Sequence, residues 1–131
     1  IRHSYLVTSN HDLVVQIGGR LTIAYSEIGE ANGSYEHCNL HIGAADYLSI
    51  THSTIRSGVY GMMIGGTDGA IIQYNNFVEN DPGKDISEVG INSNVDLRFN
   101  YWDQGTPPLG AAFNTSAPAS APISDAHPLA F

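Results

Sequence analysis

The chain has 131 residues, which is enough for one domain with a single hydrophobic core. Five lysines and arginines stand against thirteen aspartates and glutamates, so the formal net charge is −8. So few basic residues cannot form a patch that neutralises phosphates, and no apolar run reaches the length of a membrane span. We therefore expect no nucleic acid partner and no membrane insertion. The acidic balance suits a cation, a neutral glycan or a basic partner.

A short pattern of apolar, ring and small polar residues recurs five times along the chain. The copies are IRHSYL from residue 1, LTIAYSEI from 21, LSITHSTI from 48, AIIQYNNF from 70 and VDLRFNYW from 95. In register, the first column is aliphatic and contains Ile1, Ile23, Ile50, Ile72 and Leu97. A ring column contains His3, Tyr25, His52, Tyr74 and Phe99. A small polar column contains Ser4, Ser26, Ser53, Asn75 and Asn100. A closing apolar column contains Leu6, Ile28, Ile55, Phe77 and Trp102.

A second alternating segment lies inside each repeat and carries two apolar residues separated by one. The pairs are Val15 and Ile17, Leu40 and Ile42, Met62 and Ile64, and Val89 and Ile91. This period of two predicts strands with one buried face, and no stretch shows the 3.6-residue period of a helix. Each repeat therefore predicts strand, turn, strand, turn. Such a unit buries its apolar side only by stacking on its neighbours, as in a parallel β-helix.

Stacking places like residues above like. We expect the small polar column to form hydrogen bonds between coils, and the ring column to point inward with His3 and His52 as core histidines. Phe99, Tyr101 and Trp102 are expected to roof the last coil, and Pro107 and Pro108 to prevent another strand from pairing.

The repeats resemble the right-handed parallel β-helix of the pectate-lyase-like superfamily, in its short-repeat carbohydrate-binding and sugar-hydrolase form. DLRFNYWDQGTPP, residues 96–108, is similar to the motif of the family's last coil, with Asp103 where glycine is usual. We expect an all-β, right-handed parallel β-helix of about five short coils over residues 1–108. An irregular capping tail rich in Ala, Ser and Pro should follow over 109–131. The resemblance implies carbohydrate as the ligand class and an extracellular or cell-surface location.

The N-terminal end of the pattern has no roof comparable to the one expected at the other end. The chain begins at Ile1 inside the repeat, so we expect it to be a piece of a longer protein. Preceding β-helix coils or a partner chain should cover this end.

Two long excursions, residues 29–37 and 79–88, flank a short one at 56–61, and they would wall a cleft with Arg56 on its floor. There Arg56 would offset a uronate carboxylate, and Glu36 or Asp85 would act as the base of a polysaccharide lyase or glycoside hydrolase. The alternative is that the acidic loops are simply solvated and Arg56 makes surface ion pairs.

The HCNLH segment, residues 37–41, contains Cys38, the only cysteine, so no internal disulfide can form. If Leu40 points inward, His37 and His41 point outward about 13 Å apart on one strand, too far to share a metal ion. Gln16, His41 and Met63 would lie on neighbouring coils and form a glycan-binding strip with His37. Ordinary exposed side chains are the alternative.

Asp46 and Asp68 both lie four residues before the inward isoleucine of their repeat, so we expect them at the same turn of successive coils. Two aligned carboxylates would hold calcium together with backbone carbonyls, which makes calcium the one cofactor that the sequence suggests. The alternative is that both are turn residues that make local hydrogen bonds.

Two functions fit these observations. The first is a non-catalytic β-helix module of a secreted or cell-surface protein that serves as a scaffold or polysaccharide-binding surface. The second is the C-terminal portion of a lyase or hydrolase acting on an acidic glycan around Arg56. We favour the first because no pair of catalytic groups lies on regular strands.

Overall fold

The computed structural model describes residues 1–9, 11–31 and 37–129, and these residues form strands and turns without any helix. The first sheet contains β1 (Tyr5–Ser9), β4 (Glu27–Ala31), β7 (Thr54–Arg56), β10 (Asn76–Val78) and β13 (Tyr101–Trp102). The second sheet contains β2 (Val14–Ile17), β5 (Cys38–Gly43), β8 (Tyr60–Gly65) and β11 (Ile86–Glu88). The third sheet contains β3 (Arg20–Ala24), β6 (Tyr47–Thr51), β9 (Asp68–Gln73), β12 (Ser93–Asp96) and β14 (Phe113–Asn114).

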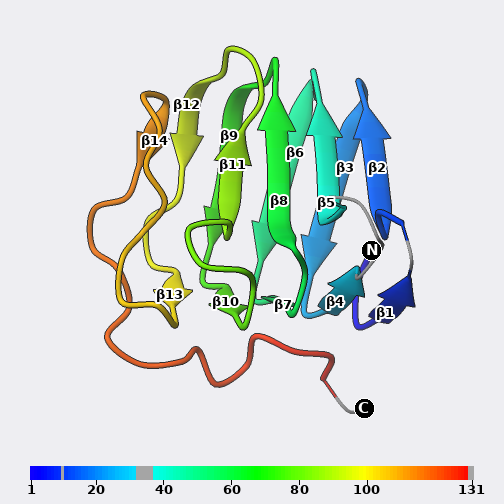
Figure 1. Ribbon diagram of the computed structural model, residues 1–131, viewed down its shortest axis with the longest axis vertical. Helices are drawn as coiled ribbons and strands as arrows, with labels where there is room; N and C mark the ends of the chain where they lie inside the picture. The colour runs from blue at the N-terminus through cyan, green and yellow to red at the C-terminus, as the bar shows by residue number, and fades with distance from the viewer. Residues whose placement is uncertain (10, 32–36, 130–131) are drawn as a thin grey trace.

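The three sheets run side by side along one axis and form a parallel β-solenoid of about four turns (Figure 1). Successive coils pair in parallel in all three sheets, as the repeat predicts. Five repeats make about four turns because the second sheet ends at β11, so the last repeat stops before its coil is closed. Since no helix is present in the described ranges, none there could span a membrane.

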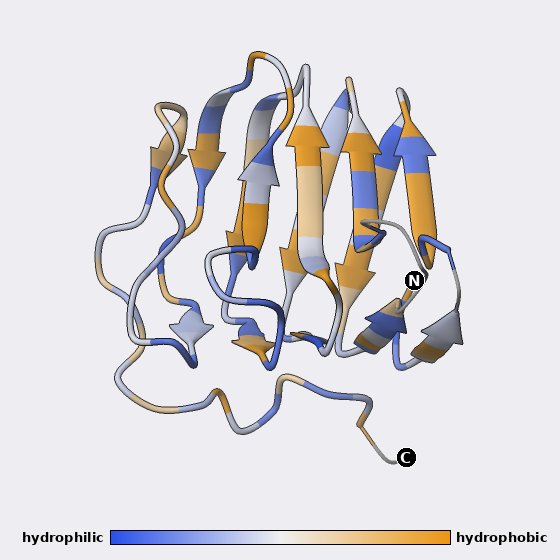
Figure 2. Cartoon of the chain, in the orientation of Figure 1, coloured by the Kyte–Doolittle hydropathy of each residue, from blue (hydrophilic) through white to orange (hydrophobic). Residues whose placement is uncertain are grey.

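The aliphatic column is the centre of the core. Ile23 pairs with Ile50, and Ile50 pairs with Ile72, and all three side chains are fully buried. In the first sheet Ile28 and Ile55 continue the closing column in the same way. Figure 2 shows hydrophobic residues along the strands of every coil. A single coil would leave these side chains exposed to water, whereas stacked coils bury them in one continuous column. This burial is the main favourable term in folding.

The small polar column forms a buried hydrogen-bond ladder between coils. The Ser26 amide donates to Ser53 Oγ (3.1 Å), and the Ser53 amide donates to Asn75 Oδ1 (3.0 Å). The Asn75 amide then donates to Asn100 Oδ1 (2.9 Å). All four side chains are fully buried. The ladder satisfies backbone amides at the corner between the third and first sheets, where strand pairing is interrupted, and this confirms the expected inter-coil bonds.

The ring column stacks as expected, but it lies on the outside of the molecule. Its ring centroids are 4.9 to 5.4 Å apart from His3 to Phe99. Each ring residue has a positive φ, for example 48° at His52, so the chain turns a corner there and the inward–outward alternation breaks. His3 and His52 are therefore half-buried surface residues, and the expectation of core histidines is wrong.

The second alternating segment is predicted correctly only in the middle coils, where Leu40, Ile42, Met62 and Ile64 are fully buried. In the first coil Val14 pairs with Leu40, so Val15 and Ile17 point outward and are 59% and 69% exposed. In the last coil Ile86 pairs with Met62, so Val89 and Ile91 are likewise exposed. A slip of one residue moves every side chain of a strand to the opposite face, and a run such as VVQI permits either register.

At the C-terminal end, Trp102 alone among the three expected roof residues closes the core. It is 4% exposed and stacks on Phe77 with ring centroids 4.7 Å apart. Phe99 instead extends the external ring column, and Tyr101 is half-buried on the outer side of the first sheet. The roof is therefore one indole ring rather than three aromatic rings.

The tail after residue 108 caps the end of the third sheet and then forms a strap along the first sheet. β14 pairs with β12, so the third sheet continues to Asn114, beyond the expected boundary, and Phe113 packs against the core. Residues 115–129 then run back along the first sheet beneath the solenoid (Figure 1). There the Asn76 side chain bonds the backbone of Ile123 in both directions (2.7 and 3.0 Å), and Thr54 Oγ1 donates to the Ala126 carbonyl (2.6 Å).

Candidate functional site

Arg56 on β7 is held by two carboxylates of the neighbouring coil. Its Nε bonds Glu27, and its Nη1 lies 3.0 Å from Glu30 Oε1. The hydrogen bonds to Glu27 and Glu30 raise the Arg56 pKa. Thr8 also donates to Glu30, and these bonds lower the Glu30 pKa. The guanidinium charge is therefore offset on the protein surface, as in the ion-pair alternative. Glu36, the expected base on this side, lies outside the described residues.

Asp85 occupies a different environment, immediately before β11 of the second sheet. It is 4% exposed and accepts a hydrogen bond from Asn80 Nδ2 (3.0 Å). Burial raises the Asp85 pKa to about 6, the Asp103 charge adds to the rise, and the Asn80 bond opposes it. With Gln104 and Pro107, Asp85 lines a cavity of about 540 Å³. Arg56 does not line this cavity, and its guanidinium is paired with Glu27 and Glu30 rather than with Asp85.

Asp85 should make the stability of the protein depend on pH. Its pKa is near 3.8 when unfolded and about 6 when folded, so the folded state binds the proton more tightly. Stability due to this group is complete below the unfolded pKa and is lost as the pH rises through the folded pKa. Asp85→Asn should remove that loss and stabilise the protein near pH 8 by up to about 3 kcal/mol, measured by denaturant unfolding. Asp125→Asn, an exposed carboxyl in the tail, should leave the profile unchanged, and an unaltered profile in Asp85→Asn would contradict the assignment.

The expected glycan strip is not formed as drawn from the sequence. Gln16 pairs with Ile42, so Gln16 and His41 lie in different columns of the sheet. The Gln16 side-chain amide donates to the Gly18 carbonyl (2.8 Å). His41 pairs with Val15 on one side and Met63 on the other. His41 and Met63 are thus neighbours, but Gln16 is excluded by the same one-residue slip that exposes Val15.

The two aspartates expected to bind calcium are both exposed. Asp68 Oδ1 accepts hydrogen bonds from Ser93 Oγ (2.8 Å) and Asn94 Nδ2 (2.9 Å), and these bonds lower the Asp68 pKa. The Asp46 amide donates to the Gly19 carbonyl (2.7 Å). Within the described ranges, the group of three potential ligands that comes together lies elsewhere and includes neither residue. The contacts of Asp68 agree with the hydrogen-bonding turn alternative.

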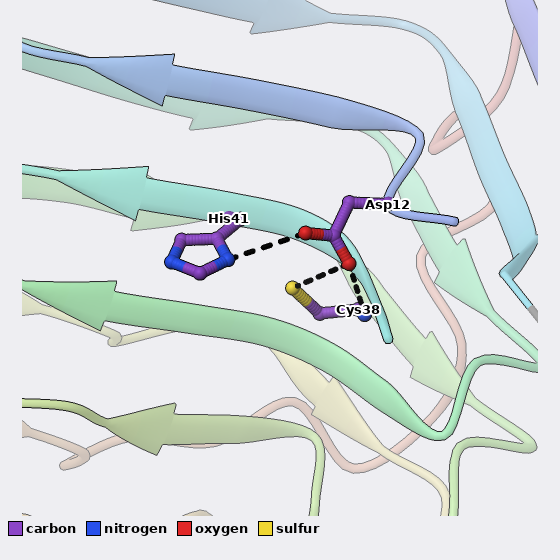
Figure 3. A group of neighbouring side chains, drawn as sticks. All are labelled: Asp12, Cys38 and His41. Carbon is purple, nitrogen blue, oxygen red and sulfur yellow. Dashed lines mark hydrogen bonds and ion pairs between the residues drawn. The ribbon is translucent and has the colours of Figure 1, made fainter. Parts of the chain in front are cut away.

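That group consists of Asp12, Cys38 and His41, whose potential ligand atoms all lie within 4.8 Å of one another. Asp12 precedes β2, and the other two residues are on β5 (Figure 3). Asp12 Oδ1 accepts the Cys38 amide (2.8 Å) and lies 3.5 Å from the Cys38 sulfur. Asp12 Oδ2 lies 3.2 Å from His41 Nδ1. One carboxylate thus joins the first two coils.

His37 also reaches this carboxylate, and its Nδ1 lies 3.4 Å from Asp12 Oδ1. The His11 ring packs edge-on against His37 at 5.0 Å. His37 and His41 thus contact opposite oxygens of one carboxylate, and the group of three potential ligands includes His41 but not His37. β5 begins at Cys38, so His37 lies before the strand, and the strand spacing does not apply to it.

The surroundings of Asp12 and Cys38 shift the pKa values of these two side chains in opposite directions. Burial alone would raise the Asp12 pKa, but hydrogen bonds from Cys38 and His41 outweigh it and lower that pKa. Cys38 is fully buried, and burial together with the Asp12 charge raises its pKa to about 12. The cysteine is therefore a neutral thiol beside an ionised carboxylate.

Sequence reasoning missed Asp12 because it misplaced the register of β2. Once Val14 is set beside Leu40, the residues two positions earlier, Asp12 and Cys38, fall beside each other. The signal was therefore present in the sequence, but it depends on a choice between two adjacent valines that hydropathy cannot make.

A shallow groove of about 880 Å³ lies on the third sheet. Its lining includes Tyr47, Gly69, Ile71, Asn92, Asn94, Asp96 and Asn114. In the third sheet Ala70 pairs with Leu48 on one side and with Val95 on the other. The residues immediately before these three therefore lie next to one another on neighbouring strands, and they are Tyr47, Gly69 and Asn94. A Cβ atom added at Gly69 would meet nothing within 4 Å. The missing side chain leaves the surface of the sheet open at this position.

Comparisons of this chain with protein-family models, with curated proteins and with solved structures found no match.

Proposed function

We propose that this β-solenoid is a non-catalytic module that binds a neutral polysaccharide along the groove of the third sheet. The observation that carries the proposal is that Tyr47, Gly69 and Asn94 place an aromatic ring, an open glycine position and an amide in one line along the groove. Sugars present an apolar face that packs on an aromatic ring and hydroxyls that bond to amides and carboxylates. A groove that crosses several coils suits an extended ligand.

Tyr47 is the proposed stacking residue. The Arg20 guanidinium lies 4.4 Å from the Tyr47 ring centroid, which fixes the ring on the sheet while the residue still lines the groove. Fixing the ring before the ligand arrives lowers the entropy that binding would cost.

The charge of the groove favours a neutral chain over a uronate polymer. Its one acidic lining residue, Asp96, is paired with Arg98 (2.8 Å). The whole protein carries a net charge of −8, so an anionic polymer would be repelled as it approached.

The likeness of the repeats to the pectate-lyase-like superfamily supports carbohydrate as the ligand class, and with it a secreted or cell-surface location. It does not by itself support catalysis, since one fold hosts many functions. Arg56, the cation that a lyase reaction would need, is neutralised by Glu27 and Glu30. The proposal therefore omits catalysis at Arg56.

The first coil supports the proposal that this module stacks on further coils. β1, β2 and β3 are each the last strand at one edge of their sheet. Exposed edges have unpaired backbone groups that can accept another strand, so preceding coils or a partner chain would extend all three sheets together.

Titration calorimetry with soluble neutral and uronate polysaccharides tests the groove. We expect a neutral polymer to bind and Tyr47→Ala to weaken that binding about tenfold or more, in line with the loss of one stacking contact. Tyr5→Ala is the matched control, because Tyr5 is 64% exposed on β1, away from the groove. Equal loss in both variants, or binding of uronates alone, would overturn the proposal. An unsaturated uronate product would support the lyase instead.

A further inference from the structure

We propose that Asp12, Cys38 and His41 form a site for a borderline-soft divalent cation, with Zn²⁺ as the ion that best suits their donors. The site lies between the first two coils of the second sheet and is independent of the glycan groove. Thiolate, imidazole and carboxylate together are the donor types that Zn²⁺ takes, whereas calcium and magnesium require oxygen donors.

The distances are close to those around a tetrahedral ion. With metal–ligand bonds of about 2.0 to 2.3 Å, two ligands of one tetrahedral Zn²⁺ lie roughly 3.5 Å apart. Here His41 Nδ1 is 3.2 Å from Asp12 Oδ2, the oxygen that would bind the ion, and the Cys38 sulfur is 3.5 Å from Oδ1 of the same carboxylate. All the donor atoms lie within 4.8 Å of one another, so small side-chain rotations would turn them toward a common centre. A water molecule would complete the four ligands.

The charges balance when the ion binds. The Cys38 thiol loses its proton to solvent as the Zn–S bond forms, because a coordinated sulfur is a thiolate. One thiolate and one carboxylate then neutralise the dication, which is what a partly buried site requires. Nδ1 of His41 binds the metal through its lone pair, so the ring carries its proton on Nε2 when the ion is bound. No oxidant or reductant is involved.

The site is partly shielded from solvent and is still open to an entering ion. The Cys38 side chain is fully buried and the Asp12 side chain is 19% exposed, whereas the His41 side chain is 38% exposed and faces solvent. An ion would therefore enter past the imidazole.

His37 is the positioning residue of this site. Its Nδ1 lies 3.4 Å from Asp12 Oδ1, so it can hold the carboxylate while Asp12 binds the ion through its other oxygen. Such outer partners orient ligands and commonly change metal affinity by about 10- to 100-fold.

Titration of the reduced protein with Co²⁺, followed by displacement with Zn²⁺, tests the site. We expect one equivalent to bind, with a sulfur-to-cobalt charge-transfer band in the near ultraviolet and d–d bands of tetrahedral strength. Zn²⁺ should remove both signals and raise the melting temperature, since an ion that binds only the folded state stabilises it.

Variants assign the ligands. Cys38→Ser should abolish the charge-transfer band, and Asp12→Asn or His41→Ala should weaken Co²⁺ binding about tenfold or more. Asp12→Asn keeps an oxygen that can accept the Cys38 amide, so it separates metal loss from misfolding. His37→Ala should weaken binding but keep the band, as a positioning role requires.

His127→Ala is the matched control, because His127 is an exposed histidine of the tail. It should leave Co²⁺ binding unchanged. The proposal is overturned if no sulfur-to-cobalt band appears, if folded Cys38→Ser binds as tightly as the parent, or if His127→Ala weakens binding equally. In those cases Asp12 has a structural role, in which it holds the Cys38 amide and the two histidine rings at the start of β5.

Discussion

Trp102→Ala is expected to lower the free energy of unfolding by about 3 to 5 kcal/mol, the range for deleting a buried aromatic side chain. The indole is 4% exposed and stacks on the fully buried Phe77, and no further coil covers it on the other side in the first sheet. Its removal would open a cavity at the end of the core and expose Phe77 to water. Denaturant unfolding followed by far-ultraviolet circular dichroism measures the loss without relying on tryptophan fluorescence.

Two control variants locate this effect. Leu109→Ala should change stability by no more than about 0.5 kcal/mol, because Leu109 is 96% exposed. Phe99→Ala should cost clearly less than Trp102→Ala, since Phe99 stacks on Tyr74 outside the core. An unchanged midpoint in Trp102→Ala, or a larger loss in Phe99→Ala, would show that the core is closed in some other way.

Asn100→Ala is expected to destabilise the protein by about 3 kcal/mol or more, through hydrogen bonds rather than apolar burial. Asn100 Oδ1 accepts the Asn75 amide, and Asn100 Nδ2 donates to the carbonyls of Ile72 (2.7 Å) and Leu97 (2.9 Å). Alanine would leave these groups without that partner in a site that water does not reach, and each orphaned group costs about 1 to 3 kcal/mol. Equilibrium urea unfolding measures the change.

Asn100→Ser should recover part of this loss, because serine already fills the same position in earlier coils. Ser53 Oγ accepts the Ser26 amide (3.1 Å) and donates to the Thr51 carbonyl (2.9 Å). Asn114→Ala, at an exposed position on β14, controls for the loss of an amide alone and should cost less than about 1 kcal/mol. A loss below 1 kcal/mol in Asn100→Ala would mean that the ladder contributes little.

The stacked columns could be predicted because their spacing repeats in every coil. Ile23, Ile50 and Ile72 coincide in space as they do in the aligned sequence, and so do the serines and asparagines of the ladder. Because each coil pairs with its neighbours, a wrong register in one repeat would misplace the equivalent residues of the adjacent coils. Five copies of one pattern therefore constrain one another.

The candidate sites were harder to predict, because each depends on a departure from the repeat. A left-handed residue at the ring position of every coil, for example Tyr25, turns the ring column outward, and the hydropathy pattern does not reveal it. The register of β2 decides whether Asp12 meets Cys38. The groove depends on Gly69, whose neighbours in the third sheet cannot be identified until the coils are aligned.

By itself, the sequence determined that this chain folds as a parallel β-solenoid with an aliphatic core and a buried ladder, because periodicity survives small errors of register. Only the tertiary structure decided that Arg56 is neutralised by Glu27 and Glu30, that the tail straps the first sheet, and that Asp12, Cys38 and His41 converge. The physical reason is that these contacts join residues far apart in the chain, and side-chain direction in a strand reverses with each residue.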